Sequence, residues 1–328
     1  MNEPSYIGAI RELICSSDNI AIIPHVFPDG DALGSALGLK CVLERTGKTA
    51  RVYSPNPVPD FYDYMPGASS VLSADDANGV SRPFDLVIAV DSADESRLGD
   101  CAVLLKRANK TAIIDHHSTN ECKADAVWID KDASATCVLI WKLAAALSVP
   151  LNHDIALCLY TGLSTDTGHF SQRNTNADAF RAASACLEAG IDAATLVEHL
   201  HKLRSLAKTR LLSRALESLQ VFADGKVVAM KLSREDFAWA GATDIQTEGI
   251  IDFGIAVRGS LAAVMCSERE GLVRVSMRSR PPISVSDTAT KLGGGGHPLA
   301  AGITLPLPLA DAYDTVVGEL VKDVLSHG

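Results

Sequence analysis

Short apolar runs rich in β-branched residues alternate with longer segments of helical periodicity in the first half of the chain. The apolar runs cover residues 20–23, 85–90 and 111–114, and the helical segments cover 32–43 and 136–147. Alternation of this kind is typical of a doubly wound parallel sheet, in which helices connect successive strands. We therefore predict an α/β fold for this half.

The second half shows a different order of elements. Residues 192–219 have a helical pattern with mixed charge and contain neither Pro nor Gly, which predicts one long connecting helix. A turn signal at Asp224-Gly225 follows, and then come strands near 226–232, 261–267, 272–277 and 300–305, with helices near 248–257 and 284–292 and a final helix. We expect a second, smaller α/β domain with a mixed sheet.

A chain of 328 residues is longer than one hydrophobic core usually serves. The predicted organisation is therefore a first domain over 1–191, a helical linker over 192–220 and a second domain over 221–328. Hydrophobic residues at 47% and charged residues at 21% describe an ordinary globular protein.

The net charge of -10 argues against a long groove for duplex DNA, which needs clustered basic residues. Small phosphorylated substrates stay compatible with this charge, because bound cations supply positive charge locally.

The start of the chain does not resemble a signal peptide, and the longest apolar stretch, 137–149, is interrupted by Lys142 and too short to span a bilayer. Eight cysteines are scattered without a C-x-x-C pair, mostly inside apolar patterns, as expected for buried thiols in a reducing cytoplasm. We expect a cytoplasmic protein that does not enter a membrane.

Acidic and histidine residues follow three of the predicted strands. The carboxyl ends of parallel strands meet at one edge of a sheet, so these side chains are expected to lie together. The candidates are His25, Asp29 and Asp31 after the first strand, Asp91 after the second, Asp115, His116 and His117 after the third, and Asp166 in a small polar segment after a helix over 152–160.

Each candidate also has an ordinary structural explanation. Asp31 is compatible with an N-cap of the helix over 32–43, with Gly30 allowing a tight turn before it. His25 is compatible with a hydrogen-bonded loop histidine, Asp91 with a turn residue, and Asp166 with a C-terminal cap. Their joint spacing favours metal binding.

The adjacent imidazoles of His116 and His117 need polar partners. Neighbouring residues point in different directions, so one can bind metal while the other faces substrate.

Carboxylates and imidazoles without thiolates suit Mn2+ or Mg2+, with Co2+, Fe or Zn2+ also compatible. Two such ions about 3.5 to 4 Å apart, bridged by a carboxylate and a hydroxide, generate the nucleophile and clamp the phosphoryl oxygens. Asp91, central among the candidates, is the expected bridging ligand.

These motifs, in this order, resemble those of the DHH phosphoesterase family. The matching segments are His25 with Pro28-Asp29-Gly30-Asp31, the strand-final Asp91, Asp115-His116-His117 and Asp166-Thr167-Gly168. In the second domain, the segments 274–279 and 293–302 resemble the substrate motif of the DHH-associated domain. The resemblance covers nearly the whole chain.

The resemblance implies a role for each candidate. His25, Asp29 and Asp91 hold the first ion, Asp31, Asp91, His116 and Asp166 hold the second, and His117, with Asp115 behind it, faces the scissile phosphate. In the second domain a terminal phosphate is gripped by Arg278, Gly294, Gly295, Gly296 and His297. Glycines expose backbone N–H groups to a phosphate, although Arg278 alone is also compatible with a solvated strand residue.

A chain with only these two domains resembles the nanoRNase and 3′-phosphoadenosine 5′-phosphate phosphatase group. The resemblance implies a homodimer that degrades short oligoribonucleotides to mononucleotides, with the terminal nucleotide held between the domains. Cleavage of cyclic di-AMP or linear dinucleotides is an alternative, as is a catalytically inactive nucleotide- or RNA-binding module. A family II inorganic pyrophosphatase is disfavoured, because its second domain lacks the glycine–His motif.

Overall fold

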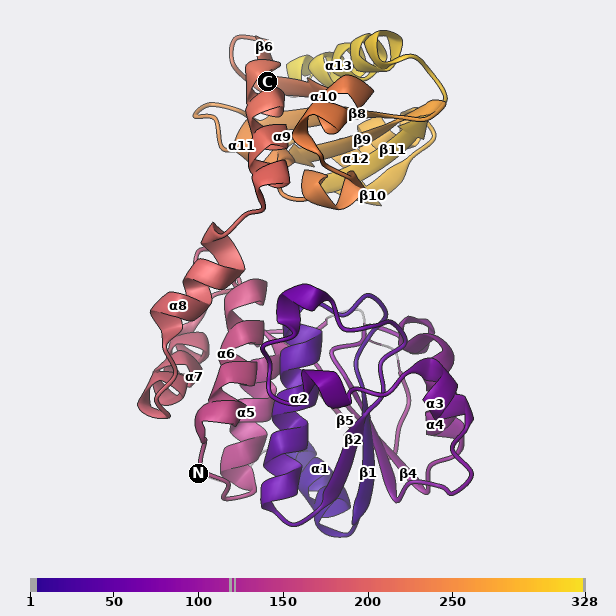
Figure 1. Ribbon diagram of the computed structural model, residues 1–328, viewed down its shortest axis with the longest axis vertical. Coiled ribbons are helices and arrows are strands. Elements are labelled where there is room, and N and C mark those ends of the chain that lie inside the picture. The colour runs from indigo at the N-terminus through magenta and orange to yellow at the C-terminus, as the bar shows by residue number, and fades with distance from the viewer. Residues whose placement is uncertain (1–4, 118–119, 121, 327–328) are drawn as a thin grey trace. The chain divides into compact units, whose positions relative to one another are not determined.

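The computed structural model describes residues 5–117, 120 and 122–326. The chain forms two compact units, Met1–Leu203 and Arg204–Gly328, each with its own sheet (Figure 1). The division falls inside the predicted linker, while the limits 1–191 and 221–328 stay a prediction.

The N-terminal unit contains a five-stranded sheet in the order β2-β1-β3-β4-β5, and every neighbouring pair is parallel. The predicted doubly wound parallel sheet is confirmed. Its strands are β1 (Asn19–Ile23), β2 (Thr49–Val52), β3 (Leu86–Val90), β4 (Lys110–Asp115) and β5 (Ala126–Ile129). Its α-helices are α1 (Ser5–Cys15), α2 (Gly30–Arg45), α3 (Ala74–Asn78), α4 (Val103–Lys106), α5 (Thr136–Ala146), α6 (His153–Asp166), α7 (Ala177–Glu188) and α8 (Ala193–Val197), with 3-10 turns η1 (Asp60–Tyr62), η2 (Ala68–Ser70) and η3 (Glu95–Ala102).

Both faces of this sheet are buried, as a continuous apolar run requires of a parallel strand. In β1, Ile20 and Ile22 belong to the core under α1, α2, α5 and α6, whereas Ala21 and Ile23 belong to the core under α3, η3 and α4. Figure 1 shows these two helix layers on opposite sides of the sheet.

The strand order reverses direction at β1, which has β2 on one side and β3 on the other. Loops that follow neighbouring strands diverge at such a reversal, and ligands bind in the crevice they leave. The segments after β1 and β3 are those that carry His25, Asp29, Asp31 and Asp91.

Helices α2 and α6 lie unusually close, because glycines face the contact. A Cβ at Gly34 would lie 2.5 Å from the backbone oxygen of Cys158, and one at Gly30 would lie 2.4 Å from Thr165 Oγ1. Gly30 is the first residue of α2 rather than a turn residue, so the expected turn was wrong. The glycine serves helix packing.

The segment between the units is not one long helix. Helix α8 continues into a π-helical turn over Glu198–Lys202, Leu203 is extended, and a new helix, α9 (Leu206–Glu217), then begins. Within the turn, His201 Nε2 lies 2.9 Å from Ser164 Oγ and His199 Nε2 lies 3.0 Å from the carbonyl oxygen of Phe61. These contacts fasten the turn to the N-terminal unit, which sequence periodicity does not reveal.

The C-terminal unit has a six-stranded sheet in the order β10-β11-β9-β8-β7-β6, in which only β7 and β8 are parallel among the described strands. The predicted mixed sheet is confirmed. Its strands are β6 (Gln220–Phe222), β7 (Val227–Leu232), β8 (Ala262–Arg269), β9 (Leu272–Ser279), β10 (Gly295–His297) and β11 (Ala300–Leu305). Its helices are α9, α10 (Arg234–Ala240), the 3-10 turn η5 (Asp244–Thr247), α11 (Ile251–Ile255), α12 (Val285–Lys291) and α13 (Leu309–Ser326).

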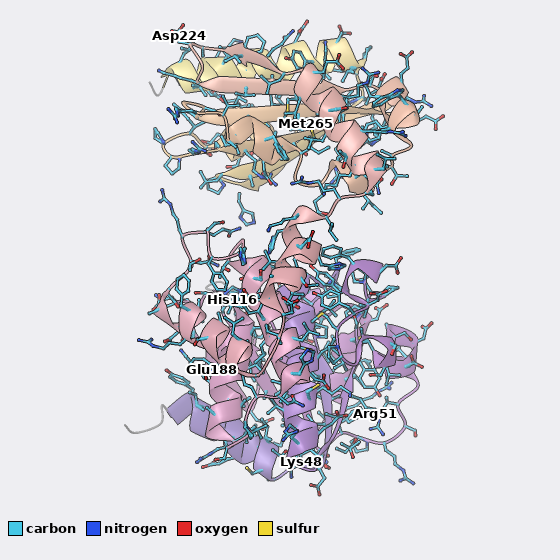
Figure 2. All side chains as sticks on the ribbon, turned by 60° about the vertical axis from the view of Figure 1, so that its left-hand side comes forward. Lys48, Arg51, His116, Glu188, Asp224 and Met265 are labelled. Carbon is cyan, nitrogen blue, oxygen red and sulfur yellow. The ribbon has the colours of Figure 1, made fainter. Side chains whose placement is uncertain are left out.

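Helices cover both faces of this second sheet as well. Helices α12 and α13 enclose one core, and α9, α10 and α11 enclose the other, which includes Met265 of β8 (Figure 2). The predicted turn at Asp224-Gly225 joins β6 to β7, with positive φ at both residues.

All eight cysteines are free thiols, and five of them are buried as predicted, but Cys15 is exposed and Cys41 and Cys122 are only partly buried. Among the described residues, no helix has both the length and the apolar character needed to cross a bilayer.

Gly34→Ala is expected to destabilise the protein by about 1–3 kcal/mol, because the new methyl group would press against backbone that cannot move aside. This corresponds to a fall in Tm of roughly 2–4 °C per kcal/mol for a unit of this size, measured by calorimetry. Gly8→Ala in α1 is the matched control, since nothing lies within 4 Å of its Cβ position. A helix interior gains from that change, so an equal loss in both variants would contradict the packing argument.

Candidate metal centre

The predicted residues of the first unit come together at the carboxyl end of its sheet. Strand β1 is closely followed by His25, β3 directly by Asp91 and β4 directly by His116. In Figure 2, His116 lies toward one end of this unit, and Lys48, which precedes β2, lies at the other.

The two carboxylate oxygens of Asp29 have different partners. It is the N-cap of α2, because Oδ1 accepts hydrogen bonds from the N–H groups of Asp31 and Ala32, each at 3.0 Å. Its Oδ2 lies 3.8 Å from Nε2 of the buried His25. The N-cap suggested for Asp31 is therefore wrong, and Asp31 is free for another role.

Asp31 is fully buried, and its carboxylate rests on the N-terminus of α5. Its Oδ2 accepts the N–H of Thr136 at 2.6 Å and its Oδ1 accepts the N–H of Cys137 at 3.0 Å. The free N–H groups at a helix N-terminus stabilise an anion. Asp31 belongs to α2, whereas the helix that stabilises its carboxylate begins about a hundred residues further along the chain.

Asp91 lies between the imidazoles of His25 and His116. Its Oδ2 is 3.6 Å from His25 Nε2, and its Oδ1 is 3.5 Å from His116 Nε2. The backbone at Asp91 has φ 54°, in the left-handed region that L residues rarely adopt. The N–H of Asp91 still donates to Ile114, so the ladder between β3 and β4 holds this conformation.

His116 and His117 have different nearest partners, although His116 Nε2 and His117 Nδ1 both lie near Asp91 Oδ1, at 3.5 and 3.7 Å. His116 Nε2 lies 3.4 Å from Asp166 Oδ2 and 3.9 Å from Asp31 Oδ2. His117 instead brings Nδ1 to 2.8 Å from Oδ1 of the buried Asp115. One imidazole therefore joins the carboxylate cluster, and the other is held by a carboxylate behind it.

Asp166 is the last residue of α6, not part of a loop after it. The helix was predicted to end near residue 160, and its further extent is a correction. Small and polar residues such as Gly162 and Thr165 are weak helix formers, but they face α2 closely, and this packing keeps the segment helical. The rigid helix places Asp166 beside His116.

Among the residues that the structure describes, three groups of side chains are close enough to share an ion. Within each group one ligand atom per residue lies within 4.8 Å of the others, and the groups are His25, Asp29 and Asp91; Asp31, His116 and Asp166; and Asp91, His116 and His117. Ligand atoms around an ion with bonds of about 2.1 Å lie about 3 to 4 Å apart. The donor set and its spacing therefore fit divalent cations.

The carboxylates in this cluster disfavour their own ionisation. Burial raises the pKa of Asp31 well above its usual value, with Asp91 and Asp166 adding to the effect. Burial likewise raises the pKa of Asp166 to about 6. A site that crowds buried carboxylates needs positive charge.

The environment of His117, unlike that of the carboxylates, favours the charged form. Its hydrogen bond with Asp115 raises the pKa of His117. Burial raises the pKa of Asp115, but hydrogen bonds from His117 and Asn120 outweigh it and leave that pKa below its usual value. His117 and Asp115 thus form a pair that favours protonated imidazole.

Two residues that support this site were missed in the sequence. Thr136 donates its hydroxyl to Asp91 Oδ1 at 2.9 Å, and Asn120 donates its amide to Asp115 Oδ2 at 2.6 Å and to the carbonyl of Ser92 at 2.7 Å. The start of the predicted helix at Thr136 was the only available signal. Both contacts depend on distant segments meeting at the sheet edge.

In the C-terminal unit, Arg278 and His297 share one row across the sheet. Ala300 of β11 is paired with Arg278 of β9 on one side and with His297 of β10 on the other. Residues in register point to the same face of a sheet. The Arg278 guanidinium also lies 3.5 Å from Asp252 Oδ1.

The glycine run is partly a strand rather than an open loop. Gly295 and Gly296 belong to β10, and a Cβ at Gly296 would lie 2.5 Å from the oxygen of Ala300. A Cβ at Gly294 would lie 2.3 Å from the oxygen of Gly302. Close backbone approach to β11 is therefore a sufficient reason for Gly294 and Gly296, beside the phosphate contact predicted for them, whereas a Cβ at Gly295 would meet nothing within 4 Å.

Comparison with known proteins agrees with this geometry. The chain is 35% identical over 309 residues to the bifunctional oligoribonuclease and PAP phosphatase NrnA of Thermus thermophilus, covering 94% of this chain and 90% of that protein. It is 27% identical to the cyclic-di-AMP phosphodiesterase PdeA of Listeria monocytogenes over 97% of this chain, but spans only 48% of that protein.

The crystal structure of an exopolyphosphatase-related protein from Bacteroides fragilis has a TM-score of 0.89 with this chain at 25% identity. It covers 99% of this chain and 98% of its own. The whole two-unit architecture is therefore shared.

Two family models match the chain, one in each unit. The N-terminal domain of the DHH family matches residues 19–163, and the DHHA1 domain matches residues 225–326. The family expected from the motifs is thereby confirmed: the chain belongs to the DHH family of phosphoesterases, with a DHHA1 domain as its second half.

Proposed function

We propose that this chain is a metal-dependent phosphoesterase that degrades short oligoribonucleotides to mononucleotides and removes the 3′-phosphate of 3′-phosphoadenosine 5′-phosphate. The observation that carries the proposal is the shared position of Asp91, whose two oxygens face the imidazoles of His25 and His116 on opposite sides. Similarity to the Thermus relative, a bifunctional oligoribonuclease and PAP phosphatase, supports the choice of substrates.

We assign two divalent ions, foremost Mn2+, to this site. His25, Asp29 and Asp91 would hold the first, and Asp31, Asp91, His116 and Asp166 the second, with Mg2+ or Co2+ as alternatives. Such ions supply Lewis-acid chemistry, since they lower the pKa of water and polarise phosphoryl oxygens.

The residues around the ions prepare the site for this chemistry. The N-terminus of α5 holds the carboxylate of Asp31 in place, and Thr136 orients Asp91. His117 keeps its Nδ1 proton on Asp115, so Nε2 is the atom that faces the substrate. A raised pKa suits this imidazole to donate a proton to the leaving oxygen.

Arg278 and His297 are assigned to substrate binding together with the backbone of Gly294–Gly296. Their shared row on the sheet supports the assignment, because both side chains can then contact one ligand.

Hydrolysis of cyclic di-AMP or of linear dinucleotides is the second candidate, supported by the identity to the Listeria phosphodiesterase. An inactive binding module is disfavoured, because all six proposed ligands are present and placed together. Rates on a dinucleotide RNA, 3′-phosphoadenosine 5′-phosphate and cyclic di-AMP, measured side by side, rank the substrates. A rate on cyclic di-AMP far above the other two would replace our first choice.

Asp91→Ala is expected to lower dinucleotide turnover with Mn2+ roughly 100-fold or more. Losing a residue that merely supports a ligand already costs 10–100-fold, and Asp91 belongs to two of the three groups. Turnover and Mn2+ stoichiometry by calorimetry are the measurements, with chelator abolishing wild-type activity. Asp125→Ala is the matched control, since Asp125 binds Thr111 and Lys110 away from the site. Full activity in Asp91→Ala would sink the bridging role.

His297→Ala is expected to lower kcat/KM for short substrates about 10-fold, because one charge-assisted hydrogen bond is lost. Bound Mn2+ should not change, because His297 lies in the other unit from the proposed ligands. His153→Ala, which alters an exposed histidine, is the control. Loss of metal in His297→Ala would contradict the separate roles of the two units.

A further inference from the structure

Arg97 is fixed beside the candidate metal centre by its backbone and by its side chain. It lies in η3, after Asp91, and its carbonyl oxygen accepts the N–H of Val26 at 2.6 Å. Its guanidinium Nη2 is 3.1 Å from Nδ1 of His25. A permanent cation therefore contacts one of the proposed ligands on the side away from Asp91.

The contact between Arg97 and His25 competes with another hydrogen bond. His25 Nδ1 also lies 2.7 Å from the carbonyl oxygen of Val26. A guanidinium can only donate and a carbonyl can only accept, so Nδ1 cannot satisfy both neighbours at once. Only one of the two neighbours can be hydrogen-bonded to Nδ1 at a time.

If Nε2 of His25 binds an ion, Nδ1 can bond the carbonyl of Val26 but not Arg97. His25 Nε2 is the atom that faces Asp29 and Asp91. A ligating imidazole gives its Nε2 lone pair to the ion and carries its proton on Nδ1. That proton then donates to Val26, and Nη2 of Arg97 loses its acceptor at His25.

A second donor of the same side chain also lacks an acceptor. Arg97 Nε is buried and has no hydrogen-bond partner among the described residues. Buried donors without partners are costly. Arg97 is only partly buried and has the electrostatic attraction of Asp94 nearby, but Nε and, in the metal-loaded site, Nη2 would still be free to donate to an anion.

The charges of the site indicate what that acceptor is. Asp29, Asp31, Asp91 and Asp166 contribute four negative charges, which two divalent ions balance without any surplus. A phosphate ester brings at least one more negative charge. A guanidinium matches phosphate oxygens in geometry as well as in charge.

We propose that Arg97 binds a phosphate oxygen of the substrate once ions occupy the site. Arg97 is then a substrate-positioning residue of the N-terminal unit, in addition to Arg278 and His297 of the other unit. This inference rests on the proposed phosphoesterase function.

The competing explanation is that Arg97 only holds His25 in place. Metal affinity separates the two, because a residue that orients His25 controls ion binding, whereas a phosphate-binding residue does not. The test compares Arg97→Gln and Arg97→Lys with Arg51→Gln. Arg51 is an arginine of the same unit that binds Asn19 Oδ1 at 2.8 Å, near the start of β1.

Two quantities are measured by calorimetry on the full chain: the affinity and stoichiometry of Mn2+, and the affinity of the Mn2+-loaded protein for AMP. AMP carries one phosphate and is a product, so the measurement does not depend on turnover. In Arg97→Gln, AMP is expected to bind roughly 10- to 100-fold more weakly, the loss of one charge-assisted hydrogen bond. Mn2+ binding stays as in the wild type. Arg97→Lys recovers part of the AMP affinity, and Arg51→Gln changes neither.

Unchanged AMP affinity in Arg97→Gln overturns the proposal, and so does weaker Mn2+ binding in that variant. Turnover of 3′-phosphoadenosine 5′-phosphate by the wild type is measured in parallel. Absence of that turnover would refute the proposed function, while the AMP titrations would still decide the role of Arg97.

Discussion

A buried carboxylate that rests on the N-terminus of another helix organises the N-terminal unit. Asp31 lies in the first turn of α2, and its oxygens accept the N–H groups of Thr136 and Cys137 at the start of α5. Burying an ionised group is expensive unless its hydrogen bonds are satisfied. Here the helix N-terminus meets part of that requirement and fixes α2 against α5, while burial still raises the pKa of Asp31 well above its usual value.

Residues in the contact between Asp31 and α5 also bind other parts of the candidate metal centre. Thr136, whose N–H binds Asp31, donates its hydroxyl to Asp91. A Cβ on Gly162 would lie 2.7 Å from Asp31 Oδ1, so the absence of a side chain on α6 leaves room for this carboxylate. Helices α2, α5 and α6 therefore meet around one acidic group, and Thr136 connects it to Asp91 at the end of β3.

The features that could be predicted from the sequence are those that depend on local pattern. The strands before His25, Asp91 and His116 are continuous apolar runs, and strand-end placement follows from the parallel topology. The end of α6 could not be predicted, because Gly162 and Thr165 are weak helix formers that stay helical only through contact with α2. The cap at Asp29 was missed because the alternative at Asp31 fits the same pattern.

The glycine run of the C-terminal unit also has two explanations. A glycine run was expected to be a phosphate loop, but Gly296 and Gly294 also allow β10 to approach β11 closely. The break after the π-helical turn has no sequence signal either, because it arises from contacts of His199 and His201 with residues far away in the chain. Long-range contacts of this kind are where sequence pattern alone fails.

The left-handed backbone of Asp91 links the site to the evolution of the chain. Most residues with a side chain lose about 1–2 kcal/mol in this conformation, glycine adopts it freely, and aspartate and asparagine tolerate it better than most. Glycine at this position would relieve the backbone but remove the carboxylate that faces His25 and His116. Retention of aspartate at this position across relatives would be a sign of selection for catalysis rather than for folding.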